Sequence, residues 1–413
     1  MEFTRRDMGR FALAGLASTS GFVPSMMGAT KPNSKIKGVQ IGAITYSFRS
    51  MPDQSAEATL QYLIDSGLSA CELMAGPITD HMRKQGKWDG SPAAAAAAAA
   101  NAGRGGRGGG PGGGGGRGPA VTYPIVANMK VGFGNDQPAG QWNGVSCPAG
   151  RGGGQAGGRG GSGAGLAAGG RGGSGGGFAG GPGGGGGGRG GAQTPEQVAA
   201  ADAERKWRLG LSMDVFKSLR KMYNDAGVTI YAIKDLPMTT DEDLEFMLNA
   251  ATALGATHFT SELPAGPTAA ATLKRLGDAA LKHKLTSAYH SHQQGSMTAF
   301  NDAFEISKGN MANVDLGHFM AATNPGGSPL DFLNKFHDKI ASFHLKDRTT
   351  VAHCALNLPW GTGETPIQEI LQTVSKNKWT MPVSIEQEYD IPEGSDAVKE
   401  VKKCTDYCRK VLG

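Results

Sequence analysis

The chain has few cysteines and none of the spacings that cysteine-based sites need. Its 413 residues include five cysteines, and no two of them form a Cys-x-x-Cys pair. Cys404 and Cys408 lie four residues apart on a predicted helix, where a disulfide between them would be strained. We therefore expect neither a zinc cluster nor a disulfide framework.

Long apolar runs and a strong charge imbalance are also absent. No stretch approaches the ~20 apolar residues that a membrane-spanning helix needs. The formal net charge is only +5, and the rest of the chain is near neutral once seven arginines of a glycine-rich block are set aside: Arg104, Arg107, Arg117, Arg151, Arg159, Arg171 and Arg189. We expect no nucleic-acid partner and no membrane span, and the oligomeric state stays open.

The first thirty residues are typical of an export signal. Arg5 and Arg6 precede a short apolar run at residues 11–16, and small residues follow up to Ala29. This pattern predicts a twin-arginine signal peptide over residues 1–29 and a periplasmic protein. An ordinary amphipathic N-terminal helix is the alternative.

A low-complexity block interrupts the chain between residues 91 and 194. It consists of poly-alanine followed by RGG and GGG repeats, a composition that buries too little apolar surface to offset the entropy of ordering. We predict that the block is disordered, apart from a more apolar island at residues 121–147 that is able to dock on the folded domain. Few aromatic residues interleave with its arginines, so a spacer or surface-attaching loop is favoured over RNA binding.

Outside this block, short apolar runs alternate with helical ones from residue 36 to the C-terminus. The alternation predicts a parallel sheet with right-handed crossovers, and eight units predict closure into a (β/α)₈ TIM barrel. The roughly 270 residues outside the signal and the block suit one such barrel, with the block as an insertion between the second strand and its helix. The predicted strands are 39–47, 70–74, 228–233, 257–261, 285–289, 312–315, 340–345 and 383–385. The predicted helices are 56–66, 201–225, 241–254, 268–283, 297–308, 330–336, 367–376 and 397–411.

Acidic and imidazole side chains gather at the predicted strand ends, where barrels of this kind build their active sites. Buried carboxylates and imidazoles are costly unless they are paired or ligated, and one metal ion would satisfy several of them together. Donors without thiolate favour one hard or borderline divalent ion, Mn²⁺ first, with Mg²⁺, Co²⁺ or Zn²⁺ as alternatives. The strand-end residues are Glu72, Glu262, His290, His292, Asp315, His318, His344, Lys346, Asp347, Glu386 and Glu388.

Five short motifs follow one another between Tyr289 and Tyr389: YHSH, NVDLGHFMAA, FHLKDR, NLPWGTGETPIQEIL and SIEQEY. Their order and spacing resemble the sugar phosphate isomerase/epimerase family of xylose isomerase-like TIM barrels. The resemblance runs from about residue 36 to the C-terminus, apart from the block.

The resemblance implies a metal site made of a carboxylate at mid-barrel and three later ligands. Asp315, His344 and Glu386 match the ligands after strands six, seven and eight. At the first position many relatives have the Glu of an ENH sequence, whereas this chain has His290, and Glu262 one strand earlier could supply the carboxylate instead. Because that first Glu is one of two acid/base groups in the epimerases, its replacement argues against ordinary two-base epimerisation.

The resemblance also implies substrate contacts around the metal. His318 matches a position that contacts the substrate in relatives, and Lys346 is expected to face a substrate hydroxyl or oxyanion. Glu72 is either a substrate contact or a satisfied carboxylate of the rim. The candidates for substrate contact are His292, His318, Lys346 and Glu72. Two neighbours, Glu388 and Asp347, are expected to orient the ligands. The histidines expected to be structural or exposed are His81, His258, His283, His337 and His353.

These parts suit proton abstraction next to a carbonyl group. A metal-stabilised enediolate would form while Glu386, Glu262 or His290 moves the proton. We therefore predict a metal-dependent isomerase or epimerase that acts on a small carbohydrate, a sugar or keto-sugar. An exported keto-glycoside lyase or hydrolase that cleaves by β-elimination is the main alternative, and a non-catalytic sugar-binding barrel is another. Type-2 apurinic endonucleases share this barrel, but their three-metal cluster needs more histidine ligands than the chain offers.

Overall fold

Eight parallel strands form a closed barrel in the computed structural model, which describes residues 31–88 and 194–413 and the backbone of four two-residue strands between them. The ring closes because β2 pairs with both β3 and β15. The barrel strands are β2 (Val39–Ile44), β3 (Ala70–Met74), β8 (Thr229–Lys234), β9 (His258–Glu262), β10 (Thr286–His290), β11 (Asn310–Asp315), β12 (Ile340–Leu345) and β15 (Val383–Ile385). A short strand β1 (Lys35–Ile36) runs antiparallel to β2.

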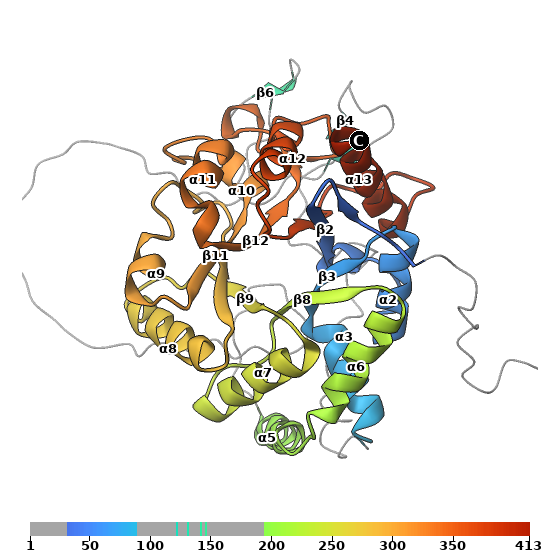
Figure 1. The fold of residues 1–413 in the computed structure, drawn as a ribbon, viewed down its shortest axis with the longest axis vertical. Coiled ribbons are helices and arrows are strands. Elements are labelled where there is room, and N and C mark those ends of the chain that lie inside the picture. Colours follow the sequence, from blue (N-terminus) through green and yellow to red (C-terminus); the bar gives the residue numbers. More distant parts are fainter. Residues whose placement is uncertain (1–30, 89–120, 123–129, 132–140, 143–144, 147–193) are drawn as a thin grey trace, which may run out of the picture. The chain divides into compact units, whose positions relative to one another are not determined.

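Helices surround the strands and alternate with them along the chain (Figure 1). They are α2 (Ala56–Asp65), α3 (Ala75–Gln85), α5 (Pro195–Leu209), α6 (Asp214–Asp225), α7 (Asp241–Leu254), α8 (Ala269–Lys282), α9 (Asn301–Ile306), α10 (Leu316–Met320), α11 (Pro329–Phe336), α12 (Ile367–Lys376) and α13 (Ala397–Leu412). Shorter elements are the 3₁₀ turns η1 (Thr45–Phe48), η2 (His337–Lys339) and η3 (Val351–His353), and a hairpin of β13 (Asp347–Arg348) with β14 (Asn357–Leu358). The predicted (β/α)₈ barrel and all eight predicted strands are confirmed.

Two predicted features of the region before β8 are wrong. The helix predicted over residues 201–225 is two helices, because α5 ends at Leu209, before Gly210, and α6 begins at Asp214. The helix α3 follows β3 directly, so the low-complexity block comes after this helix rather than before it. The sequence did not reveal α3 because Gly76 and Pro77 stand in its first turn, where proline is tolerated although it breaks a helix interior.

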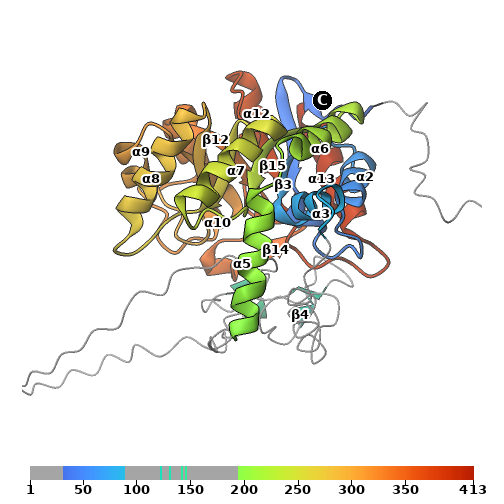
Figure 2. The ribbon, with the colours of Figure 1, turned by 90° about the horizontal axis from the view of Figure 1, so that it is seen from below.

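Helix α5 lies outside the ring of barrel helices, beside α7 (Figures 1 and 2). Arg205 and Arg208 attach it by ion pairs to Asp243, which is buried at the start of α7. The ring of Trp207 packs against Trp88 at a centroid distance of 4.8 Å. The Trp88–Trp207 contact joins the chain on either side of the block.

The interior of the barrel is partly polar. Tyr231 crosses it and donates a hydrogen bond from its hydroxyl group to Ser384 Oγ at 2.9 Å. Gly42 makes room for this ring, since a Cβ atom there would lie 2.7 Å from it. Further buried polar side chains on the strands are Glu72, His258, Thr260, Asn313, Ser342 and His344. They support the site at the C-terminal ends of the strands.

Cys71, Cys404 and Cys408 are free and buried. The last two lie four residues apart on α13 and, as expected, form no disulfide with each other. Cys354 is disulfide-bonded, which corrects the expectation for this cysteine. No helix in the described part of the chain is long and apolar enough to cross a membrane. The predicted signal peptide and nearly all of the block lie outside the described residues.

Candidate metal centre

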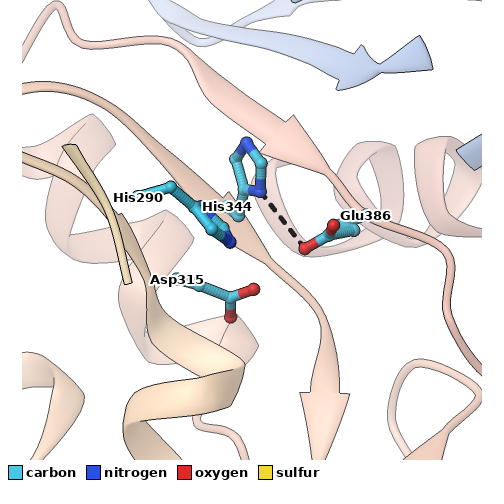
Figure 3. Close-up of side chains that lie close together, drawn as sticks. All are labelled: His290, Asp315, His344 and Glu386. Atoms are coloured by element: carbon cyan, nitrogen blue, oxygen red, sulfur yellow. Dashed lines mark hydrogen bonds and ion pairs between the residues drawn. The ribbon is translucent and has the colours of Figure 1, made fainter. Parts of the chain in front are cut away.

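Four polar side chains converge inside the mouth of the barrel. Three of them belong to β10, β11 and β12, and the fourth directly follows β15. They are His290, Asp315, His344 and Glu386. Each offers one ligand atom, and these atoms all lie within 4.8 Å of one another. Figure 3 shows the side chains directed toward a common centre. Ligand atoms about 2.0–2.2 Å from an ion lie at most ~4.4 Å apart, so the four fit around one metal ion after a small adjustment.

The strand register brings these four residues to one level of the barrel. Asp315 is the direct partner of His344 in the β11–β12 pair. His344 is in turn the partner of Ser384 in β15, and Glu386 follows two residues later on the same face. Side chains two residues apart on a strand share a face, so the parallel register sets the cluster.

His290 is held by an amide that sequence reasoning missed. Its Nδ1 lies 3.1 Å from Asn313 Oδ1, and the amide nitrogen of Asn313 donates to Ser342 Oγ at 2.8 Å. With the amide oriented this way, His290 Nδ1 donates the hydrogen bond and Nε2 keeps a lone pair. Burial, with Lys234 and His344 nearby, holds the pKa of His290 well below its usual value. The ring is therefore neutral, as a metal ligand requires.

Asp315 presents a buried carboxylate oxygen whose partner is the ammonium group of Lys346. Its Oδ1 accepts a hydrogen bond from the backbone N–H of His318 at 2.8 Å. Its buried Oδ2 accepts none, although Lys346 Nζ lies within ion-pair distance at 2.8 Å. Burial raises the pKa of Asp315 to about 7, against the lowering effect of Lys346. Beyond the charge of Lys346, a divalent ion would give this buried oxygen a coordinating partner.

His344 lies between two carboxylates. Its Nδ1 is 3.2 Å from Glu386 Oε2, and its Nε2 is 2.8 Å from Glu72 Oε2. Burial alone would lower the pKa of His344, but Glu72 and Glu386 raise it to about 10. Burial likewise would raise the pKa of Glu386, but Lys346 and His344 hold it well below its usual value. Without a metal, then, the centre holds an imidazolium ion and an ionised Glu386.

Lys346 balances the remaining negative charge. Its Nζ lies 2.8 Å from Asp315, 3.1 Å from Glu386 and 2.5 Å from Glu388. These carboxylates raise the pKa of Lys346 although burial lowers it. The ammonium group shares two carboxylates with the candidate metal centre. It is therefore close enough to donate to an oxygen of a molecule bound there.

His318 is held by a buried arginine that sequence reasoning also missed. Arg348 Nη1 lies 2.6 Å from His318 Nδ1. Since a guanidinium group only donates, Nδ1 must accept and Nε2 must carry the ring proton. That Nε2 is 3.9 Å from both Asp315 Oδ2 and Glu388 Oε2, too far for a hydrogen bond. His318 thus presents an N–H group beside the centre.

The two remaining candidates lie at the rim. The side chains of Glu262 and His292 are each 52% exposed, and they are 3.5 Å apart at their closest polar atoms. Glu262 pairs with the buried Lys234 at 2.9 Å and lies outside the cluster. The ring of His292 packs against that of His290 at 4.9 Å. The structure thus brings His290, and not Glu262, together with the other three ligand candidates. Lys234, at the end of β8, was not singled out from the sequence.

The other polar residues named from the sequence have partners away from the centre. Asp347 accepts hydrogen bonds from four backbone N–H groups of the loop before α12. A Cβ atom at Gly363 would lie 2.3 Å from that carboxylate, so the loop needs glycine there. Five histidines contact other groups: His81 contacts Ser218, His258 contacts Ser342, His283 contacts Glu245, His337 stacks on Trp379 and His353 contacts Glu364.

The fold and the cluster together define a TIM barrel with a candidate metal centre at the C-terminal ends of its strands. No model of a protein family matches the chain, and no curated protein matches it by sequence. Many of its structure neighbours are xylose isomerase-like or sugar phosphate isomerase/epimerase proteins, as the motifs predict.

Three of these neighbours illustrate the likeness. A xylose isomerase domain protein from Planctomyces limnophilus is 13% identical, with 48% of this chain and 82% of that chain covered and a TM-score of 0.40. A sugar phosphate isomerase/epimerase from Parabacteroides distasonis is 16% identical, with 46% and 74% covered and a TM-score of 0.38. The probable 3-DHS dehydratase of Bacillus anthracis is 10% identical, with 89% and 98% covered and a TM-score of 0.47.

Proposed function

We propose that this protein is a divalent-metal-dependent isomerase or epimerase that moves a proton next to the carbonyl group of a sugar or keto-sugar. The buried cluster of two imidazoles and two carboxylates carries the proposal, because its four ligand atoms lie within 4.8 Å of one another. An ion held by the four side chains would supply Lewis acidity to a substrate oxygen. The sugar class rests on the family resemblance of the motifs.

Glu386 is the base in this proposal. Lys346 and His344 hold its pKa well below the usual value, so it is ionised at neutral pH, and as a weak base it would rely on the ion to acidify the neighbouring C–H group. The N–H of His318 and the ammonium group of Lys346 are donors on the same side of the barrel mouth. Donors fixed near a carbonyl oxygen stabilise the negative charge that develops when the adjacent carbon loses its proton.

A second reaction at this site is keto-glycoside cleavage by β-elimination. One observation favours it: His290 occupies the position of the first carboxylate, and Glu262 is half-exposed and paired with Lys234. The first-position carboxylate, which would be the second acid/base group of an epimerase, is therefore not part of the cluster, whose carboxylates are Asp315 and Glu386. Glu386 would take the proton from the carbon next to the carbonyl, and the bond to the leaving oxygen on the following carbon would break with its electron pair. A base on one side of the substrate is sufficient for that reaction.

The proposal is tested on purified protein, first by elemental analysis and then with keto-sugars and 3-keto-glycosides in deuterated solvent. Isomerisation or epimerisation gives a rearranged sugar with deuterium at the carbon next to the carbonyl. Elimination releases the leaving alcohol. Asp315→Asn, which removes the charge of one candidate ligand, is the inactive control. Binding of sugars without exchange or cleavage would instead support a non-catalytic sugar-binding barrel, and the absence of a divalent-metal site would refute the metal-dependent function.

We also propose export by the twin-arginine route to the periplasm, on the basis of Arg5 and Arg6. The export receptor reads paired guanidinium groups rather than charge alone. The double variant Arg5→Lys/Arg6→Lys should therefore stay in the cytoplasm, as measured by cell fractionation. Normal periplasmic levels of the variant would overturn the assignment.

A further inference from the structure

Glu72 is a carboxylate buried inside the barrel, next to the candidate metal centre. It belongs to β3, its side chain is 0% exposed, and its neighbours Cys71 and Leu73 are buried as well. Both oxygens of this carboxylate already have protein partners, which leaves none for a substrate. A role other than substrate contact is therefore needed to explain a charge at this position.

The two oxygens of Glu72 have different partners. Thr260 donates its hydroxyl hydrogen to Oε1 at 2.6 Å, and His344 Nε2 lies 2.8 Å from Oε2. The other ring nitrogen, Nδ1, faces Glu386 and the centre of the cluster (Figure 3). A ring that binds a metal has one proton left, and a carboxylate at one nitrogen keeps that proton there. The contact with Glu72 therefore leaves the lone pair on Nδ1.

We propose that Glu72 is a positioning residue of the metal centre, which fixes the tautomer and orientation of His344 and adds a third negative charge to those of Asp315 and Glu386. One hydrogen-bonded chain links β9, β3 and β12 through Thr260, Glu72 and His344. The charge of Glu72 compensates for a difference in this chain, because His290 is neutral where many relatives have the Glu of an ENH sequence. The proposal rests on the proposed function only in requiring that the cluster binds a metal.

A purely structural role for Glu72 makes a different prediction. A buried ion pair contributes little net stability compared with apolar residues of the same volume, and its loss acts on folding in general. A positioning role acts on metal affinity and on the tautomer of one histidine. Both are measurable without any substrate.

The test is titration of chelator-treated full-length protein with Zn²⁺ and with Mn²⁺. Glu72→Gln keeps the shape of the side chain and removes its charge, and we expect binding to weaken about 10 to 100-fold. The matched control is Glu400→Gln. Glu400 is also buried, and it accepts a hydrogen bond from Tyr389 and pairs with Lys403 on α13. Its metal affinity should equal that of the wild type.

A second readout uses the wild-type protein alone. In Zn²⁺-loaded protein labelled with ¹⁵N-histidine, long-range ¹H–¹⁵N spectra should show the proton of His344 on Nε2, with the signal assigned by its loss in His344→Gln. A proton on Nδ1, or a Glu72→Gln variant that binds Zn²⁺ as tightly as the wild type, would overturn the positioning role. Failure of the wild type to bind any divalent ion would instead refute the proposed function.

Discussion

The two halves of the barrel mouth are built differently. The second half, made of β10, β11, β12 and β15, supplies all four side chains of the cluster. The first half, made of β2, β3, β8 and β9, supplies Glu72, Lys234 and Glu262, which pair with one another or with His344. One half therefore carries the ligand atoms, and the other half adds Glu72, a charged residue that contacts one of those ligands. Changes in the second half should abolish function, whereas changes in the first half should tune it.

The largest effect is expected at Glu386, which is both a ligand and the base in our proposal. Glu386→Gln keeps the shape and one oxygen donor but removes the charge and the basicity. Turnover should fall by roughly 10² to 10⁴-fold. Metal affinity should fall by at least the 10 to 100-fold typical of lost supporting contacts.

Turnover measured against added Mn²⁺, beside solvent exchange of the substrate α-proton, separates the two roles of Glu386. Saturating metal cannot replace a missing base, so activity should stay low. Full recovery of turnover and exchange would make Glu386 a ligand only and would move the search for the base to His290 or Glu262.

The next largest effect is that of pH on metal affinity. The pKa of His344 is raised to about 10 in the metal-free protein, so below that pH a metal must displace one proton from the ring. The apparent affinity for Mn²⁺ should therefore rise roughly tenfold per pH unit from pH 7 to pH 9. Below a pH of about 7 Asp315 also takes up a proton, and the dependence should steepen. Titrations over this range, with proton release measured by calorimetry in two buffers, check the prediction; a flat profile above pH 7 would contradict it.

The same pKa shift has a consequence for the stability of the metal-free protein. A folded-state pKa above the unfolded value of 6.5 means that protonated His344 stabilises the fold. This contribution is fully present below pH 6.5 and is lost as the pH rises through 10. Chemical unfolding of His344→Gln and the wild type should thus differ less at pH 10 than at pH 6.

A smaller effect is expected when the low-complexity block is removed from the first half. All eight barrel strands and the helices between them lie outside residues 91–193. Loop-closure entropy depends weakly on length, so this term alone should change the free energy of unfolding by less than about 2 kcal/mol when a short linker replaces the block. Thr194 should be kept, because its side chain caps α5 by accepting a hydrogen bond from the backbone N–H of Gln197. Aggregation of the deletion protein would show that residues 121–147 support the fold.

The comparison of the halves also explains how far the sequence could predict the site. The alternation of strands and helices predicted the barrel, and polar residues at strand ends predicted Asp315, His344 and Glu386 as neighbours. Asn313, Lys234 and Arg348 were missed, because a lysine, arginine or amide near a strand end is usually solvated and gives no signal before the register is known. Helix α3 was missed because Gly76 and Pro77 obscure its start.

The choice between His290 and Glu262 was out of reach of the sequence for a related reason. The two residues are direct partners in the β9–β10 register, each at the last position of its strand. The sequence pattern and the spacing of the motifs therefore do not distinguish His290 from Glu262 as the first ligand. They differ only in packing: His290 is buried and held by Asn313, whereas Glu262 is half-exposed at the rim.

The smallest expected effect decides between these two residues. Glu262→Gln removes the charge of a half-exposed side chain and leaves an amide oxygen near the buried Lys234. Metal affinity should barely change, because Glu262 lies outside the cluster. His290→Gln is the matched variant at its register partner, and it should weaken metal binding by at least 10 to 100-fold. Zn²⁺ titration of both variants beside the wild type gives the answer. A strong loss of affinity in Glu262→Gln with an unchanged His290→Gln would move the first ligand to β9 and remove the contrast between the two halves of the barrel.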